Sequence, residues 1–224
     1  ADLNRAIRLE PDYTLAYLML GEAHAVRQDH DRALACFDEA IRLAPKLAAA
    51  YLGRARIHAA RGQHDAVLGD VATALRLRAP GADVFALRGA ALLGKRELGQ
   101  ALANFTEALK LDSQNAVIWR NRARAHLARH DPNAALDDLD RAIELNGQDA
   151  LTFACRAEAH VARGEFERAL ADCDRALQLD PRLVGAHVIR GDACRGKRDP
   201  DGALAAYDQA LHLDPKDIVA RVAR

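Results

Sequence analysis

Apolar residues recur at intervals of three and four along the whole chain, in short runs separated by polar turns. Between residues 150 and 183, for example, Phe153 and Ala157 stand on one helix face, and Phe166 and Leu170 begin a second one. This spacing matches the 3.6-residue period of an α-helix and not the alternation of a strand. The pattern therefore predicts two consecutive helices within this stretch.

The two-helix pattern returns every 34 residues, with no insertion or deletion between copies. An alanine in the second helix marks the register: Ala6, Ala40, Ala74, Ala108, Ala142, Ala176 and Ala210. The register divides the chain into a partial unit (1–13), six full units (14–47, 48–81, 82–115, 116–149, 150–183 and 184–217) and the start of a seventh (218–224). A fixed period of this length is typical of a repeat array whose units stack on their neighbours. We expect a single repeat domain over residues 1–224.

Charged residues mark the turn inside each unit. A basic residue ends the first helix in every full unit: Arg27, Arg61, Lys95, Arg129, Arg163 and Lys197. Two positions later an acid or a glutamine starts the second helix: Asp29, Gln63, Glu97, Asp131, Glu165 and Asp199. The helix dipole favours cations at C-termini and acids at N-termini. Prolines close several second helices: Pro45, Pro80, Pro181 and Pro215. Each unit is therefore predicted to be a helix–turn–helix.

This pattern resembles the tetratricopeptide repeat, a 34-residue helix–turn–helix with a large residue early, a small one four positions later, and alanine, phenylalanine, alanine and proline behind. The first unit supplies these residues as Tyr17, Gly21, Ala33, Phe37, Ala40 and Pro45. The second unit departs most, with Val67 and Val71 where alanine and phenylalanine are expected and its proline at Pro80. The resemblance covers essentially the whole chain. It implies an all-α fold, a solenoid of helix pairs that forms a right-handed superhelix.

Arginine stands one position before the small residue in five units, where the family generally has leucine: Arg54, Arg88, Arg122, Arg156 and Arg190. Sixteen residues later stand Asp70, Asn104, Asp138, Asp172 and Ala206. We interpret these pairs as partly buried arginine–aspartate bridges between the two helices of a unit. Because Arg190 lacks the aspartate, Asp208 is its expected substitute. A basic stripe that binds phosphate is the alternative interpretation.

Overall charge and composition exclude several function classes. The chain has 32 basic and 32 acidic residues, whereas a nucleic-acid-binding protein usually carries a basic excess. No apolar run approaches 18 residues, so no membrane span is predicted. The four cysteines show no motif spacing, which favours small buried residues in a reducing compartment such as the cytoplasm.

No pattern for metal binding or catalysis appears. His24, His58, His126 and His160 share one register, but equivalent positions on neighbouring units lie at least about 8–10 Å apart. They cannot share one zinc ion, whose ligands all lie within about 2.3 Å of it. There is no glycine-rich phosphate loop and no nucleophile with a histidine at motif spacing. We therefore predict a non-enzyme without a metal or cofactor.

In the fold that the resemblance implies, the first helices line a concave groove. The residues at groove positions that we single out as peptide-binding candidates are Leu18, Met19, Leu52, Arg56, Leu87, Arg120, Asn121, Arg124, Glu158, Ile189 and Asp192. Such a face is mostly apolar, which on a soluble protein usually marks an interaction site. Arg120, Asn121 and Arg124 form its densest polar cluster and are suited to a carboxylate or phosphate on a partner. Glu158 is an alternative, internal partner for Arg124.

Two sites of known family members are not carried over. The clamp that holds a C-terminal carboxylate in chaperone adaptors would need basic and asparagine residues where this chain has Cys155, Gly185 and Ile189. The asparagine ladder of members fused to a sugar transferase is matched by Asn121 alone.

The sequence thus predicts a protein–protein interaction scaffold that binds a peptide or partner segment in an apolar groove. The alternative is a regulatory or substrate-recruiting arm of a larger enzyme, because the chain begins and ends inside a repeat. Two further alternatives are self-association through the end repeats and coverage of the groove by a neighbouring segment or a second copy.

Overall fold

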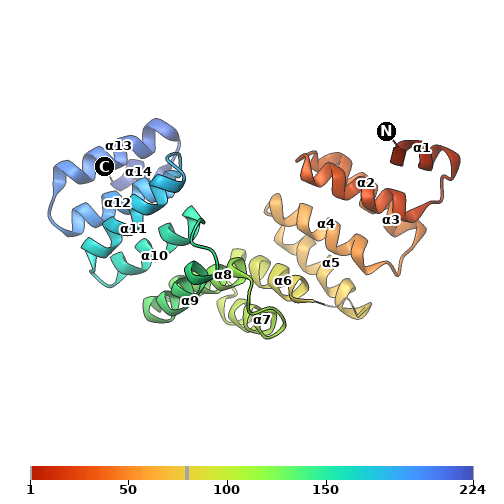
Figure 1. Ribbon diagram of the computed structural model, residues 1–224, viewed down its shortest axis with the longest axis horizontal. Helices are drawn as coiled ribbons and strands as arrows, with labels where there is room; N and C mark the ends of the chain where they lie inside the picture. The colour runs from red at the N-terminus through yellow and green to blue at the C-terminus, as the bar shows by residue number, and fades with distance from the viewer. Residues whose placement is uncertain (1, 79–80, 224) are drawn as a thin grey trace. The chain divides into compact units, whose positions relative to one another are not determined.

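The computed structural model describes residues 2–78 and 81–223, apart from the side chain of residue 4. Within these residues the chain is all-α, with fourteen helices and no strand, as predicted (Figure 1). The predicted helix-closing Pro80 and the chain ends at Ala1 and Arg224 lie outside the described residues.

The chain divides into two compact parts, Ala1–Ser113 and Gln114–Arg224, each of which contains several repeats. From here on, the first unit and the second unit are these two parts, each described by itself, and the 34-residue units are called repeats. The first unit contains α1 (Asp2–Leu9), α2 (Thr14–Val26), α3 (His30–Leu43), α4 (Ala48–Ala60), α5 (His64–Arg76), α6 (Ala82–Gly94) and α7 (Leu98–Leu111). The second contains α8 (Ala116–Ala128), α9 (Pro132–Leu145), α10 (Ala150–Ala162), α11 (Phe166–Leu179), α12 (Val184–Gly196), α13 (Pro200–Leu213) and α14 (Ile218–Ala223). The even-numbered helices begin 34 residues apart. The assignment of residues 1–224 to one domain stays a prediction.

Each unit has an inner and an outer helix layer. The two helices of a pair pack on each other, and the second helix of one pair packs on the first helix of the next. Consecutive first helices are also in contact, for example α2 with α4 and α10 with α12. Consecutive second helices make no such contact among the described residues. The second helices are therefore splayed, and the first helices form the tighter, inner layer of each unit.

Close approach of the two helices in a pair depends on a glycine in the first helix. A Cβ atom added at Gly89 would lie 2.8 Å from the Phe105 ring, and one at Gly21 would lie 2.7 Å from the Phe37 ring. Phe37 and Phe105 are buried, so their rings cannot easily move away. The same ring of Phe37 also meets Gly53 of the following pair, where an added Cβ would lie 2.5 Å away. A small residue of the first helix thus fits closely against a bulky residue of the second, and this fit extends between neighbouring repeats.

The turn inside a pair reverses the chain through one left-handed residue. In the first full repeat this residue is Gln28, whose φ is 59°, and the Asp29 amide donates to the carbonyl of His24. That bond pattern is the Schellman motif, which satisfies the last carbonyls of the first helix. The Asp29 carboxylate then accepts a hydrogen bond from the Arg32 amide and caps the second helix. Asp131 and Asp199 cap α9 and α13 in the same way, as predicted.

None of the described helices is long and apolar enough to cross a lipid bilayer.

Candidate interaction faces

Arginines of the first helices hold buried aspartates of the second helices in three repeats. Arg54 donates to Asp70 from Nε at 2.9 Å and from Nη2 at 2.6 Å. Arg122 and Asp138 make the same pair of bonds at 2.8 and 2.6 Å, and Arg156 and Asp172 do so at 2.8 and 2.7 Å. Each aspartate is buried. The predicted arginine–aspartate bridge is therefore confirmed in these repeats as a two-point, charge-assisted contact.

The same arginines also reach back to the preceding repeat. Nη1 of Arg54 donates to Asp38 at 2.6 Å, and Nη1 of Arg156 donates to Asp140 at 2.8 Å. Both acids stand sixteen residues before their arginine, whereas the buried aspartates stand sixteen residues after it. One guanidinium thus joins the second helices of two successive repeats. Two acids on one arginine raise the pKa of the Arg54 guanidinium, and its hydrogen bond to Asp70 contributes most.

Two arginines of this register depart from the rule. Arg88 is exposed, and its expected partner Asn104 donates instead to the carbonyl of Gln100. Arg190 lies 3.6 Å from Asp174, an acid of the preceding repeat. The expected bridge from Arg190 to Asp208 is therefore replaced by one to Asp174. The reason is geometric. Wherever an acid stands sixteen residues before the arginine, it lies within reach of the arginine's Nη1, as Asp38, Asp140 and Asp174 do.

Histidines of the first helices connect the turn to the buried aspartate. Nδ1 of His160 lies 2.8 Å from Glu165, the capping residue of the second helix, and Nε2 lies 3.7 Å from Asp172. His126 repeats this arrangement with Asp131 and Asp138 at 3.9 Å each. Among residues 2–78 and 81–223, no group of three His, Cys, Asp or Glu side chains is arranged to hold a metal ion.

We define the first-helix face of each unit by the predicted peptide-binding candidates together with four exposed aliphatic residues of the same helices, Leu15, Val26, Val117 and Leu151. In the first unit these are Leu15, Leu18, Met19, Val26, Leu52, Arg56 and Leu87. In the second they are Val117, Arg120, Asn121, Arg124, Leu151, Glu158, Ile189 and Asp192. The structure separates them into packed and open side chains.

The leucines of the first unit are largely used in packing. Leu18 packs against the buried cluster around Phe37, and Leu52 and Leu87 pack against the cluster around Val67. Met19, in contrast, is 54% exposed. Arg56 makes an ion pair with Asp83 at 2.7 Å, which links α4 to α6 across the exposed face. Exposed pairs of this kind stabilise a fold by less than about 1 kcal/mol, so Arg56 is still available to a ligand.

Arg120 already has a partner within the second unit. Its guanidinium donates to the carboxylate of Asp149, and only 15% of its side chain is exposed. Asp149 also accepts a hydrogen bond from the Leu151 amide and one from the Thr152 hydroxyl at 2.6 Å, so it caps α10. Arg120 therefore orients the start of the next first helix, a role that its place in the predicted polar cluster did not suggest.

Arg124 and Glu158 are the exposed charged pair of this face. No ion pair within 4 Å joins them among the described residues, yet each senses the other's charge. Although Glu158 is exposed as a residue, the protein around its carboxylate partly desolvates it and raises its pKa; Arg124 lowers this pKa in part, and Asp192 adds to the rise. The predicted alternative, in which Glu158 neutralises Arg124, thus holds only as a weak interaction. Arg124 is exposed, and within residues 2–78 and 81–223 its guanidinium makes no hydrogen bond or ion pair.

Asp192 and Ile189 are engaged at the end of this face. Asp192 accepts hydrogen bonds from the Tyr207 hydroxyl and from Arg195, each at 2.8 Å. Burial, with the hydrogen bond to Asp192 next, raises the pKa of Tyr207 to about 12. Ile189 is half-buried and packs against the core around Ala176. Both residues therefore serve packing of the last repeats more than an open surface.

Sequence reasoning missed the acids that occupy the arginines. Asp83 and Asp149 stand 27 and 29 residues after Arg56 and Arg120, and Asp38 stands sixteen before Arg54. The first two spacings connect the start of one first helix to the middle of the preceding one. Asp149 is the last residue of the repeat that contains Arg120 and caps the next first helix, whereas Asp83 and Asp38 lie in neighbouring repeats. A search of the start of the next first helix and of the preceding second helix would have found all three.

Comparisons with known proteins agree on the repeat. A family model described as "Tetratricopeptide repeat" matches residues 1–48, 18–83, 87–150 and 156–218. No curated protein sequence matches the chain.

Three solved structures illustrate the similarity in fold. The first, "APC/C hetero-tetramer Cut9-Hcn1", is 18% identical with a TM-score of 0.90, over 99% of this chain and 44% of that one. The chain thus spans less than half the length of that protein. PilW, a "type IV pilus biogenesis factor", is 18% identical with a TM-score of 0.81, over 93% of this chain and 97% of its own. PilF of Pseudomonas aeruginosa is 18% identical with a TM-score of 0.76, over 93% and 95%. At such identities the similarity concerns the fold alone.

Proposed function

The chain belongs to the tetratricopeptide repeat family, and from that premise we propose that it is a protein–protein interaction scaffold. The partner segment binds on the first-helix face, and no catalytic step is part of the proposal. Within each unit the inner layer is continuous from repeat to repeat, so it suits an elongated ligand.

The observation that carries the proposal is the set of aliphatic side chains left open on this face. Leu15 and Met19 are about half exposed in the first unit, and so are Val117 and Leu151 in the second. Val26 is 86% exposed. All five lie on first helices and belong to the first-helix face defined above. Apolar side chains that gather on one layer of a water-soluble fold favour burial against a partner.

Polar side chains on the second unit's face orient the partner segment. Arg124 has open guanidinium donors, and Asn121 stands three residues before it on the same helix. We assign to these two residues the recognition of a carboxylate or phosphate on the partner. Arg120 acts indirectly, since its bond to Asp149 holds the start of α10 and with it Leu151. Glu158 beside Arg124 selects against partners with a second acid nearby.

A peptide selection tests this assignment. A library of phage-displayed 12-residue peptides is selected on the immobilised chain, and the enriched peptides are measured by fluorescence anisotropy. We expect peptides with aliphatic residues at regular spacing and one acidic group. Met19→Glu or Arg124→Glu is expected to weaken binding of the peptides to the respective unit at least tenfold, because each places a charge that repels the ligand.

Arg88→Glu is the matched control for Arg124→Glu. Arg88 is also an exposed arginine of a first helix, but its register belongs to the arginines that face the second helices. It should leave peptide binding unchanged. Equal effects of the two substitutions would mean that only overall charge matters, and unchanged binding by Met19→Glu and Arg124→Glu would remove the first-helix face as the site.

A further inference from the structure

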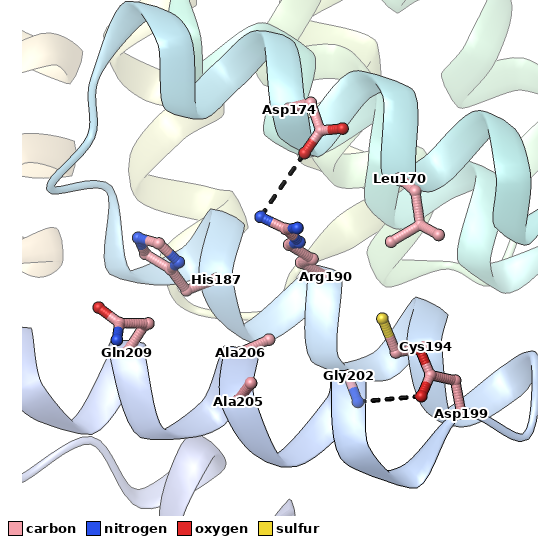
Figure 2. Close-up of a pocket in the computed structure, with 10 residues that line it drawn as sticks. All are labelled: Leu170, Asp174, His187, Arg190, Cys194, Asp199, Gly202, Ala205, Ala206 and Gln209. Atoms are coloured by element: carbon pink, nitrogen blue, oxygen red, sulfur yellow. Dashed lines mark hydrogen bonds and ion pairs between the residues drawn. The ribbon is translucent and has the colours of Figure 1, made fainter.

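A cavity of about 380 Å³ opens on the second-helix side of the second unit, between α11, α12 and α13. Figure 2 shows Arg190 reaching from α12 towards Asp174 of α11, with Ala206 of α13 on the opposite side. The cavity exists because successive second helices are splayed apart. The floor of the cavity is α12, so Arg190, which belongs to the arginine register, lies at its centre.

The preceding repeat provides an internal reference for this cavity. There a cavity of about 460 Å³ is lined by Asp140, Arg156 and Asp172, which stand 34 residues before Asp174, Arg190 and Ala206. Arg156 holds Asp172 by two hydrogen bonds and Asp140 by a third. In the last full repeat, alanine stands where Asp172 would be, so the methyl group of Ala206 leaves the position of a carboxylate empty.

Exposure of the arginine follows the loss of this carboxylate. The side chain of Arg190 is 46% exposed, against 24% for Arg156 and 25% for Arg54. Its ion pair with Asp174 is also longer, at 3.6 Å against 2.8 Å for Arg156 and Asp140. A guanidinium has five donors in a planar fork that matches a carboxylate at two points. In Arg190 the part of that fork used by the buried aspartate elsewhere faces the cavity.

We propose that this cavity binds a carboxylate group, which takes on Arg190 the place that Asp172 takes on Arg156. The ligand class is a small organic carboxylate or the side chain of an aspartate or glutamate on another molecule. The site lies on the second-helix side, so the inference is independent of the peptide site on the first-helix face.

The acids around the cavity do not prevent this binding. Asp174 already lies against Arg190, and Asp199 is used as the cap of α13, where its carboxylate accepts from the Gly202 amide at 3.0 Å. The reference site has the corresponding acids, Asp140 and Glu165, and still holds the carboxylate of Asp172. The arrangement of one arginine between two acids is thus one that this fold already stabilises.

Titration followed by NMR tests the proposal on the full chain. The probes are sodium succinate and a blocked peptide with a single aspartate, each compared with sodium chloride at equal ionic strength. We expect saturable shifts of the Arg190 Nε–H signal and of the Gly202 and Ala205 amides with a carboxylate probe, and none with chloride. Binding of both probes indicates a site for free carboxylates, and binding of the peptide alone indicates a partner's side chain.

Two substitutions make the test specific. Ala206→Asp supplies the missing carboxylate from the chain itself and should weaken binding at least tenfold. Arg190→Gln removes the charge and should also weaken binding at least tenfold. This second variant tests the proposal if circular dichroism shows that Ala206→Asp does not fold. Asn104→Asp, which adds an aspartate in the same register of the third full repeat, is the matched control and should leave binding unchanged. The absence of saturable shifts in the wild-type chain, or equal binding by Arg190→Gln, would overturn the proposal.

Discussion

Arg54 donates two parallel hydrogen bonds of 2.9 and 2.6 Å to Asp70, and its Nη1 donates a third, of 2.6 Å, to Asp38 of the preceding repeat. One side chain therefore ties together a first helix, its own second helix and the second helix before it. In a repeat protein such a contact acts at the interface between neighbours, which is where much of the stability resides.

Removal of the aspartate should destabilise the chain. In Asp70→Ala, Arg54 stays half-buried without its main partner, and the chain loses two charge-assisted hydrogen bonds. We expect a loss of about 2–3 kcal/mol in the free energy of unfolding, less than for a fully buried pair because Arg54 keeps some solvent contact. Urea denaturation followed by circular dichroism measures it. Arg88→Ala is the control and should change the free energy by no more than about 0.5 kcal/mol. Equal effects would mean that the bridge does not contribute.

The third full repeat offers the reverse experiment. Asn104 stands where Asp70 stands one repeat earlier, and Arg88 is exposed nearby. Asn104→Asp should create the missing bridge and stabilise the chain by about 1 kcal/mol, the net contribution of a typical charge-assisted contact at a partly exposed site. A double-mutant cycle with Arg88→Ala isolates the interaction between the two residues. A coupling energy of zero would show that the two side chains do not meet.

Two helical glycines should respond to alanine in opposite ways. At Gly69 an added Cβ meets nothing within 4 Å, so Gly69→Ala should stabilise the chain by about 0.5–1 kcal/mol through helix propensity alone. At Gly89 the added Cβ lies 2.8 Å from the buried Phe105 ring, so Gly89→Ala should destabilise by about 1–2 kcal/mol despite the same gain in propensity. Thermal or urea unfolding of both variants gives the comparison. A stabilised Gly89→Ala would mean that the seam between the two helices is looser than the structure indicates.

The cysteines should be poor nucleophiles in the folded chain. Burial raises the pKa of Cys155 to about 11 and that of Cys173 to about 12, so little thiolate is present at pH 8. Iodoacetamide should alkylate Cys155 at least about tenfold more slowly in the folded chain than in urea, as site-resolved mass spectrometry would measure. Because the unfolded thiol ionises first, the stability that this burial provides is present below about pH 9 and is lost as the pH rises towards 11. Equal rates in the folded and unfolded chain would contradict the prediction.

The apolar pattern and the 34-residue period of the sequence predicted much of the fold. The 34-residue recurrence, the apolar spacing and the acid or glutamine at the start of each second helix predicted helix pairs. Arg122 with Asp138 was predicted as a contact because both partners lie in one repeat at a fixed distance along the chain. A contact inside a helix–turn–helix follows from sequence separation, since the turn has one geometry throughout.

The candidate site was predicted less completely. Met19 and Arg124 are exposed, but Arg120 is held by Asp149 and Leu52 is largely packed. The apolar spacing does not distinguish these cases, because whether a first-helix side chain is free depends on what the start of the next first helix places beside it.

The sequence by itself thus determined the repeat, the helix pairs and the bridges inside them, all of which depend on residues within one helix pair. Only the tertiary structure decided which charged side chains are left open. That choice depends on contacts between repeats, such as Arg190 with Asp174, and on the splay of the second helices that opens the cavity beside Ala206. The angle at which one pair packs on the next results from many side chains acting together, so it cannot be read from the spacing of any few.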